Sequence, residues 1–366
     1  MQNEEKLLTD YLESLKGEIA VVTKTLDKFF SDRIEQVAHL GPWHKEYYGN
    51  VKEYIMRGGK RLRPVLVILG YKAVKGDTVP DNLYTASLCV EILHNGSLLH
   101  DDLIDHDETR RGGKTFHATY RDINYSRSKD KDAAFDYGMT MAILGGDSLI
   151  NLGASAITAA NLDGDISSHL HHLYEFAFQN LVDGVLLEMN MISDDTATTE
   201  TYLQMVRMKT AVLFDRSLMM GAAVARATES QLDALEEFGV KVGKAFQIQD
   251  DILGSFGDEE KLGKSSSGDI REGKKTMLVF EVYAKATPDQ RKEFDQLLGK
   301  SDITEEEIDR VRELFRETGA LESTQKRMTE LLSSGQQALD NAEPPLDEKY
   351  KKFLIGLSDF LVQRDF

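Results

Sequence analysis

The stretch Leu98-Leu99-His100-Asp101-Asp102-Leu103-Ile104-Asp105 places three aspartates at the end of an otherwise apolar segment. Upstream, Leu88 and Ile92 continue the apolar spacing of one helical face, so the segment is predicted to end a long helix. Asp101 and Asp105 are four residues apart and share a face of that helix. Like charges at this spacing cost roughly 0.2–0.5 kcal/mol. A bound divalent cation would remove that repulsion.

A second stretch, Phe246–Gly254 (FQIQDDILG), repeats the pattern, with Asp250 and Asp251 inside an apolar run near the end of another predicted helix. Carboxylates with no cysteine nearby suit a hard cation, Mg²⁺ before Zn²⁺. Mg²⁺ usually shares its coordination shell with substrate phosphates. One such cluster could be a solvated helix end, but two matched clusters predict a site in which aspartates hold Mg²⁺.

Positive charge is bunched beside glycine at several places in this acidic chain. The clusters are GGKRLRP (58–64), TRRGGK (109–114), GK (263–264) and GKKT (273–276), and Lys209-Thr210 lies within a predicted helix. Glycine lets the backbone approach an anion, and Arg and Lys donate to phosphate oxygens. A solvated loop could explain any one cluster, and none is a P-loop. Their alternation with the acidic clusters predicts a ligand with a diphosphate head, and the apolar helix faces predict a hydrocarbon tail.

The chain as a whole has 366 residues and a net charge of −18. This charge argues against binding to nucleic acid or to an anionic membrane surface. The single cysteine, Cys89, excludes an intrachain disulfide and is interpreted as a small buried hydrophobic residue. The N-terminal residues have no signal-peptide pattern, and no stretch approaches the ~18 apolar residues of a membrane span. We therefore expect a cytoplasmic protein with no stable membrane insertion.

Helical periodicity and scarce proline predict an all-α chain with one continuous core; no proline occurs between Pro80 and Pro288. The predicted helices, with errors of about 2–4 residues at each end, are 4–35, 45–57, 64–74, 81–108, 134–161, 165–190, 199–226, 231–253, 274–286, 288–299, 304–317, 319–341 and 346–363. The polar stretches Arg121–Asp132 and Glu259–Glu272 are predicted to be exposed loops. The second loop is a candidate lid.

The ordered set GGKRLRP, Glu91-x-x-His94, LLHDDLIDxDxxRRG, Lys209-Thr210, FQIQDD and GKK resembles the trans-isoprenyl diphosphate synthases of the polyprenyl synthetase family. The resemblance runs from about Gly58 to Thr276 and more loosely to the end. It implies the isoprenoid synthase fold, a single domain (1–366) of about 10–13 helices around a deep central cavity, and a homodimer. Within the family, the chain is most like the synthases that make geranylgeranyl diphosphate or a longer-chain diphosphate.

The resemblance also implies roles for individual residues. It assigns isopentenyl diphosphate binding to Lys60, Arg63, His94 and Arg111, and allylic diphosphate binding to Arg110, Lys209, Thr210, Gln247, Lys264 and Lys274. Asp101 and Asp105 would ligate two Mg²⁺ ions, with Asp102 in direct or indirect contact. Asp250 would ligate a third ion, supported by Asp251. These five aspartates and Lys209 form the expected catalytic set.

Two positions depart from the family pattern. Gly254 stands where the second acidic motif usually ends in another aspartate, and Val185 stands where many relatives carry glutamine. The third metal would then have fewer protein ligands, and we expect activity to survive with altered affinity.

The expected reaction is a Mg²⁺-dependent head-to-tail condensation. The allylic C–O bond breaks, and Mg²⁺ and basic residues stabilise the leaving diphosphate. The cavity excludes water, the isopentenyl double bond attacks the carbocation, and the departed diphosphate takes the final proton. His100, His106 and His117 are interpreted as polar packing residues. This chemistry requires the two aspartate pairs to face each other across an apolar pocket.

Product length is predicted from the helix face upstream of Asp101. Gly96 and Ser97 are small, whereas a bulky aromatic there shortens the product in the family. Leu93, Val90 and Phe178 could form the floor. The pattern favours geranylgeranyl diphosphate or longer. Three alternatives stay open: a farnesyl diphosphate synthase, a class I terpene cyclase, which needs no second diphosphate site, and a non-catalytic subunit of a heteromeric synthase.

Overall fold

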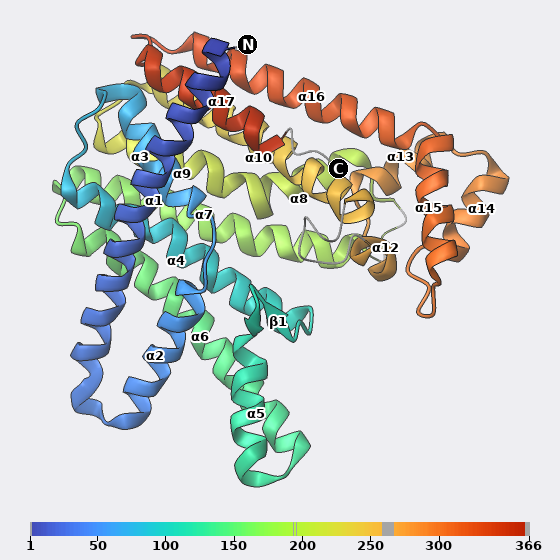
Figure 1. The fold of residues 1–366 in the computed structure, drawn as a ribbon, viewed down its shortest axis with the longest axis horizontal. Helices are drawn as coiled ribbons and strands as arrows, with labels where there is room; N and C mark the ends of the chain where they lie inside the picture. The colour runs from blue at the N-terminus through green and yellow to red at the C-terminus, as the bar shows by residue number, and fades with distance from the viewer. Residues whose placement is uncertain (1, 193, 195, 258–266, 363–366) are drawn as a thin grey trace. The chain divides into compact units, whose positions relative to one another are not determined.

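The computed structural model describes residues 2–192, 194, 196–257 and 267–362, which are almost entirely helical (Figure 1). The all-α prediction is confirmed. The chain folds into two compact units: unit 1 comprises residues 1–178 and 217–227, and unit 2 comprises residues 179–216 and 228–366. The prediction of a single domain stays a prediction.

Unit 1 contains the helices of the first half of the chain. Its elements are α1 (Gln2–Val37), η1 (Ala38–Leu40), α2 (Pro42–Met56), α3 (Leu62–Lys75), α4 (Asp81–Ile104), β1 (Thr109–Arg110), β2 (Gly113–Lys114), α5 (Phe116–Ser128), α6 (Lys131–Ala159) and parts of α7 (Gly164–Met191) and α9 (Val212–Val224). Helices α4 and α6 make an extensive helix pair. The short apolar helix α3 is buried along most of its length. A Cβ at Gly70 of α3 would lie 2.1 Å from the Leu218 carbonyl oxygen of α9, so glycine permits this close crossing.

Helix α6 packs against both α4 and α5. Among the described residues it is the helix that is long and apolar enough to cross a membrane, although 44% of the relevant window is buried inside the protein. Core helices of soluble proteins share this property. Length and hydropathy therefore do not distinguish a packed helix from a spanning one here.

The predicted loop at Arg121–Asp132 is wrong, because most of it forms α5. The buried residues of this helix, Phe116, His117, Ala118 and Tyr120, lie in its first turns, while its later charged residues are half-buried or exposed. Lys129, in the left-handed conformation, ends α5, and Asp130 caps the next helix. The polar stretch is thus an amphipathic helix with a solvated face. The predicted helix 81–108 also ends earlier, at Ile104, and a short hairpin follows it.

Unit 2 has its own apolar core. Its elements are the remainder of α7 and α9, α8 (Thr199–Val206), η2 (Arg207–Ala211), α10 (Glu229–Phe256), α12 (Gly268–Glu272), α13 (Met277–Lys285), α14 (Pro288–Leu297), α15 (Glu305–Glu317), α16 (Ala320–Ala338), η3 (Leu339–Asn341) and α17 (Glu348–Val362). Helix α16 runs along α10 (Figure 1). Tyr202, Ile248 and Phe315 belong to one buried cluster.

Two further expectations need correction in unit 2. The predicted helix 199–226 is interrupted by a π-helical turn, η2, because its hydrogen bonds shift register at Arg207–Ala211. The predicted loop Glu259–Glu272 contains the short helix α12, which buries Ile270. Residues 258–266 of that stretch lie outside the described part of the chain, so the lid expectation stays a prediction.

Candidate active site

The first acidic cluster lies at the carboxyl end of α4. The backbone N–H of Asp105, which caps the helix, donates to the Asp101 carbonyl at 2.8 Å. Asp101 is half-buried and Asp105 exposed. The carboxyl end of a helix carries the negative pole of its dipole, so nearby aspartates favour a cation there.

Asp102 has a different environment from its neighbours, with 0% of its surface exposed. One carboxylate oxygen accepts a hydrogen bond from the Tyr54 hydroxyl at 2.7 Å, and the other accepts from Arg110 Nε. Burial raises the pKa of Asp102, and the Arg110 charge opposes that rise. Asp102 is thus held in place by donors of the protein itself.

The hairpin arginine Arg111 reaches the glycine-rich loop before α3. Its Nη1 donates to the Gly58 carbonyl and to Asn95 Oδ1, each at 3.2 Å. A Cβ at Gly59 would lie 3.3 Å from Arg111 Cζ, so a larger residue there would crowd the guanidinium. The structure therefore brings the two predicted basic clusters of unit 1 together.

Sequence reasoning missed the buried pair beneath this loop. Arg61 Nη1 lies 2.6 Å from Glu91 Oε1, and both side chains are almost fully buried. Asn95 Nδ2 also donates to Glu91 Oε1, at 3.1 Å. Glu91 belongs to the ExxH motif, which was the signal present in the sequence. Its structural role depends on Arg61, which lies 30 residues away in sequence.

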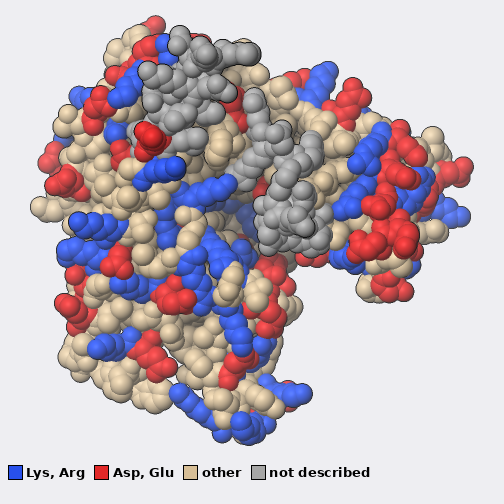
Figure 2. Space-filling model, viewed as in Figure 1, with Lys and Arg blue, Asp and Glu red and all other residues tan. Residues whose placement is uncertain are grey.

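Arg63 and His94 lie in an environment rich in arginine. Burial lowers the pKa of Arg63 to about 10, which leaves it charged at neutral pH. Its Nε is buried without a hydrogen-bond partner among the described residues. Burial, followed by the charges of Arg63 and Arg111, lowers the pKa of His94 well below its usual range, so the imidazole is neutral. These features fit an anion site, and Figure 2 shows Lys and Arg side chains gathered over the part of unit 1 where α4 and the hairpin lie.

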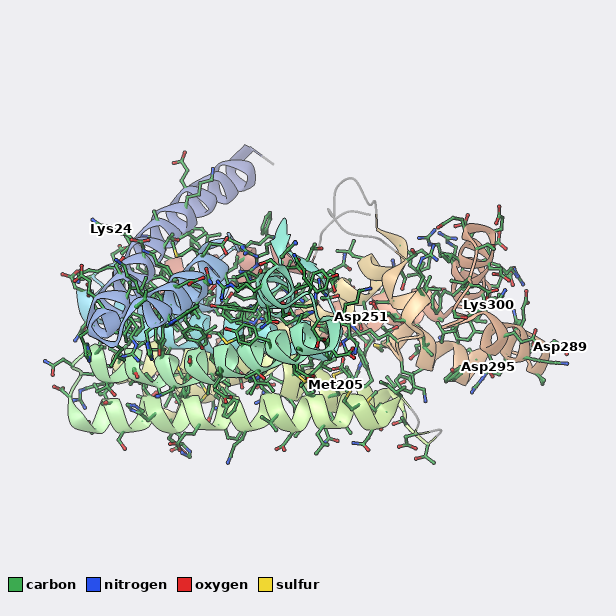
Figure 3. The ribbon with its side chains drawn as sticks, turned by 90° about the horizontal axis from the view of Figure 1, so that it is seen from below. Lys24, Met205, Asp251, Asp289, Asp295 and Lys300 are labelled. Carbon is green, nitrogen blue, oxygen red and sulfur yellow. The ribbon has the colours of Figure 1, made fainter. Side chains whose placement is uncertain are left out.

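The second acidic cluster, in unit 2, repeats the arrangement of the first. Asp251 is 2% exposed and accepts hydrogen bonds from the Tyr202 hydroxyl at 2.6 Å and from Gln247 Nε2 at 2.9 Å. Burial raises the pKa of Asp251 to about 7, against the opposing charge of Lys274. Asp250 is half-buried. Figure 3 labels Asp251 well away from the outer residues Asp289, Asp295 and Lys300 of the same unit.

Lys209 and Thr210 lie on the π turn and join this network. Lys209 Nζ is 2.5 Å from Glu188 Oε2, and Thr210 Oγ1 donates to Gln247 Oε1 at 2.8 Å. Because Gln247 also donates to Asp251, it connects the π turn to the acidic cluster. The structure thus links Thr210, Gln247 and Asp251 by hydrogen bonds within unit 2, and Lys209 stands beside Thr210 on the same turn.

Lys274 and Asp269 lie beside the same cluster. Burial alone would lower the pKa of Lys274, but Asp251 and Asp269 outweigh it and raise the pKa. Lys274 Nζ lies 3.8 Å from Asp269 Oδ1. A Cβ at Gly254 would lie 2.5 Å from Asp269 Oδ2. A carboxylate from α12 therefore occupies the space next to the position where the motif lacks its final aspartate.

The donor set suits Mg²⁺ that is shared with a substrate. Among the described residues, no group of three or more His, Cys, Asp or Glu side chains is arranged to hold a metal ion alone. Paired carboxylates beside arginine and lysine fit an ion that takes further ligands from phosphate and water.

The predicted chain-length residues occupy distinct positions on α4. Val90 and Leu93 are fully buried. A Cβ at Gly96 would lie 3.1 Å from Leu149 Cβ of α6, so Gly96 permits the close packing of α4 on α6. Ser97 is half-buried, and its hydroxyl donates to the His94 carbonyl at 2.9 Å. Ser97 is therefore a better candidate than Gly96 for a position that tolerates a larger side chain.

For some predicted residues the common site stays a prediction. Asp101 and Asp105 belong to unit 1 and Asp250 to unit 2, so the expectation that the two pairs face each other stays a prediction. Lys60 is exposed. Lys264 lies outside the described residues.

Comparisons with known proteins agree on one family. The polyprenyl synthetase family model matches residues 44–315. The chain is 34% identical to a geranylgeranyl diphosphate synthase of Saccharolobus solfataricus, over 84% of this chain and 87% of that protein. It is 31% identical to a geranylfarnesyl diphosphate synthase of Aeropyrum pernix, over 85% and 92%. The structure of a Corynebacterium glutamicum geranylgeranyl pyrophosphate synthase, complexed with isoprenyl diphosphate and magnesium, superposes with a TM-score of 0.87 at 26% identity, covering 96% of this chain and 99% of that one.

Proposed function

The chain belongs to the polyprenyl synthetase family and is a trans-prenyl diphosphate synthase, and from this premise we propose its specific reaction. It condenses isopentenyl diphosphate head-to-tail with an allylic diphosphate in a Mg²⁺-dependent reaction. The product is geranylgeranyl diphosphate or a longer trans-polyprenyl diphosphate. Relatives named as geranylgeranyl and geranylfarnesyl synthases support this range.

The observation that carries the proposal is the repeated aspartate arrangement. In each unit, the second aspartate of a pair is buried and held by a tyrosine hydroxyl, at 2.7 Å for Asp102 and 2.6 Å for Asp251. In each unit, the first aspartate of the pair is less buried. In this proposal, the hydrogen bond from tyrosine to the buried aspartate anchors the end of the helix, so that the neighbouring Asp101 or Asp250 keeps a defined direction. Two such ends beside basic residues suit binding of a metal-complexed diphosphate.

Mg²⁺, when bound, would neutralise charge on the leaving diphosphate, and Asp101, Asp105 and Asp250 would hold three ions. Lys209, with Thr210, would bind the allylic diphosphate oxygens. Arg63 and Arg111 would bind isopentenyl diphosphate. A neutral His94 can donate a hydrogen bond without adding charge. These residues position both substrates for attack by the isopentenyl double bond, and the departing diphosphate can accept the released proton.

Product length follows from the packing on α4. No bulky aromatic stands at Gly96 or Ser97, and Leu93 and Val90 are buried further along the helix. A small residue at Ser97 leaves room for a long hydrocarbon tail. We infer products of twenty carbons or more.

The enzyme also acts as a homodimer in this proposal. Phe135, Met139 and Ile143 recur every fourth residue along α6, and each is at least 36% exposed. Exposed apolar residues grouped on one face of this 29-residue helix form a contiguous stripe rather than scattered single residues, and such apolar patches mark interaction surfaces. We propose that a second copy of the chain packs against this stripe in the dimer.

The test is an assay of the purified chain alone with Mg²⁺, isopentenyl diphosphate and dimethylallyl, geranyl or farnesyl diphosphate, with products separated by chromatography. Products of twenty carbons or more are expected. Asp101→Ala should abolish turnover and retain the fold, whereas the exposed Asp136→Ala should retain activity. A dominant fifteen-carbon product would indicate a farnesyl synthase. A cyclic hydrocarbon made without isopentenyl diphosphate would indicate a cyclase, and no product would indicate a non-catalytic subunit.

A further inference from the structure

The segment that carries Lys209 and Thr210 is unusual in its backbone. Between α8 and α9 the helix widens to a π turn from Arg207 to Ala211. A π turn inserts one extra residue into a helix and is rare, because its geometry is less favourable than that of the α-helix. The surrounding side chains must therefore stabilise it.

An ion pair spans this turn. Arg207 Nη2 lies 2.8 Å from Asp215 Oδ2, eight residues further along the chain. At about 100° per residue, eight residues of regular α-helix turn about 80° beyond two full turns, so the two side chains would lie at opposite edges of a helix face rather than in line. The extra residue of the π turn gives the pair the spacing of seven residues, within about 20° of one face. The pair thus fits the π-helical form and favours it over the regular form.

Asp215 is fully buried among balanced charges. The Arg216 backbone N–H donates to Asp215 Oδ1 at 2.8 Å, and Arg216 Nη2 lies 3.6 Å from Asp215 Oδ2. Glu236 of α10 pairs with Arg216 at 2.5 Å and lies 3.6 Å from Arg207. A buried carboxylate needs such partners, since an unpaired one is strongly destabilising.

Three glycines on neighbouring helices allow close packing against the backbone of the segment from Lys209 to Asp215. A Cβ at Gly184 of α7 would lie 2.8 Å from the Lys209 backbone nitrogen. On α10, a Cβ at Gly243 would lie 2.6 Å from Ala211 Cα, and one at Gly239 would lie 2.4 Å from Asp215 Cα. The backbone of the π turn is therefore closely packed on two sides, and the register of its hydrogen bonds fixes where Lys209 and Thr210 point.

We propose that Arg207 and Asp215 are positioning residues, whose ion pair keeps the π turn in the register that presents Lys209 and Thr210 to the allylic diphosphate. The inference rests on the proposed function of those two residues. Neither Arg207 nor Asp215 needs to touch substrate. They act through the backbone between them, and substrate binding depends on the turn that they hold.

The experiment compares Asp215→Asn and Arg207→Gln with the wild-type enzyme at pH 8. Each variant should raise KM for farnesyl diphosphate about tenfold, the size typical of a lost supporting residue. KM for isopentenyl diphosphate should stay within about twofold, because its predicted binders lie in unit 1. Arg207→Lys should recover part of the loss. Titration calorimetry with inorganic diphosphate and Mg²⁺ should show that the variants bind diphosphate more weakly than the wild type. This measurement does not depend on turnover.

The matched control is the exposed ion pair Arg226–Asp163, at 2.9 Å, which belongs to unit 1, whereas the π turn belongs to unit 2. Arg226→Gln should leave both KM values unchanged. A double-mutant cycle with Lys209→Ala provides the sharper criterion: if Arg207 acts through Lys209, the combined loss is smaller than the product of the single losses. If Asp215→Asn fails to fold, the partly exposed Arg207 carries the same test.

The outcomes separate two failures. A wild-type protein without prenyl synthase activity would overturn the proposed function itself. An active wild type whose variants lower kcat and raise both KM values together, in line with a lower Tm, would show a merely structural pair and overturn the inference. Multiplicative effects with Lys209→Ala would also overturn it.

Discussion

Asp102 and Asp251 are carboxylates with almost no exposed surface, and each is kept there by two donors. Burying an ionised carboxylate is costly unless hydrogen bonds replace its water. Tyr54 and Arg110 do so for Asp102, and Tyr202 and Gln247 do so for Asp251. Each tyrosine hydroxyl, together with the second donor, therefore fixes the direction of its buried carboxylate.

Replacing Tyr202 by phenylalanine removes one of these donors without changing the packing volume. A hydrogen bond to a charged group contributes roughly 1.5–3 kcal/mol. We expect the Mg²⁺ concentration for half-maximal activity to rise about tenfold, the change typical when a supporting partner of a metal ligand is lost. Titration of activity against Mg²⁺ measures it, and the exposed Tyr125→Phe is the control. An unchanged Mg²⁺ requirement in Tyr202→Phe would show that Tyr202 does not position a metal ligand.

Asp215 gives a prediction about pH. Burial raises its pKa to about 7, Arg207 and Arg216 oppose that rise, and Glu236 adds to it. Because the folded pKa lies above the ordinary value of 3.8, the folded state holds this proton more tightly than the unfolded state. The stability from this group is therefore present below about pH 4 and is lost as pH rises through about 7.

Asp215→Asn cannot titrate, so the unfolding free energy of the wild type minus that of the variant should fall as pH rises from 5 to 8. Denaturant unfolding at several pH values measures this difference. The surface variant Asp163→Asn should show no such trend between those values. A difference that is constant with pH would contradict a raised pKa for Asp215.

At the scale of elements, the long helices were predictable because apolar periodicity and the absence of proline leave few alternatives. Helices α4, α7 and α10 occur close to their predicted ranges. α5 was missed because its buried face is short and its charged face is long, which looks like a loop in sequence. The π turn was invisible, since a shift in hydrogen-bond register leaves no mark on hydrophobic spacing.

In the site, too, residues that belong to short motifs were predictable, whereas contacts between residues far apart in the sequence were not. The aspartates and the glycine-flanked basic residues were recognisable because their chemistry lies within short motifs. Tyr54 is 48 residues from Asp102 and Tyr202 is 49 from Asp251, so their pairing depends on the tertiary structure. Arg61 looked like one more basic residue of its motif until the structure buried it against Glu91.

Helix α10 gives a prediction at Gly254, where the added Cβ would lie 2.5 Å from Asp269 Oδ2. We expect Gly254→Ala to push α12 away, lower Tm and reduce activity about tenfold, within the 10–100-fold range for lost supporting partners. Gly254→Asp should be worse, because it adds a like charge, so restoring the family motif should not restore function. Gly268→Ala, which meets nothing within 4 Å, is the matched control. Higher activity in Gly254→Asp would show that Asp269 does not fill this position.

Helix α4 gives a prediction about product length. Ser97 is half-buried one residue after the tightly packed Gly96. We expect Ser97→Phe to shift the main product to fifteen carbons by blocking the path of the tail, with the fold retained. Gly96→Phe should destabilise the protein instead, because its side chain would meet α6. Chromatography of the products and thermal unfolding distinguish the two. An unchanged product from Ser97→Phe would place the tail along another face.

At the scale of the whole molecule, a chain with net charge −18 must capture two anionic substrates. Long-range attraction cannot assist, because like charges repel. Capture must rest on local clusters: the arginines around His94 in unit 1, and Lys209 and Lys274 in unit 2. Each compact unit supplies one acidic and one basic cluster, so neither unit alone is expected to carry out the condensation.

The exposed stripe on α6 belongs to this scale, because it concerns what covers the chain. Charge repulsion disfavours self-association of an acidic protein, so a dimer needs apolar contact to offset it. Phe135, Met139 and Ile143 supply such a surface on one helix face. We expect the enzyme to elute at twice the chain mass in size-exclusion chromatography with light scattering, and Ile143→Glu to shift it toward monomer. Asn151→Glu adds the same charge to an exposed position of the same helix two turns beyond Ile143 and should leave the dimer intact. A wild-type monomer at micromolar concentration would leave the stripe without its proposed partner, whereas a dimer that survives Ile143→Glu would place the interface on another face.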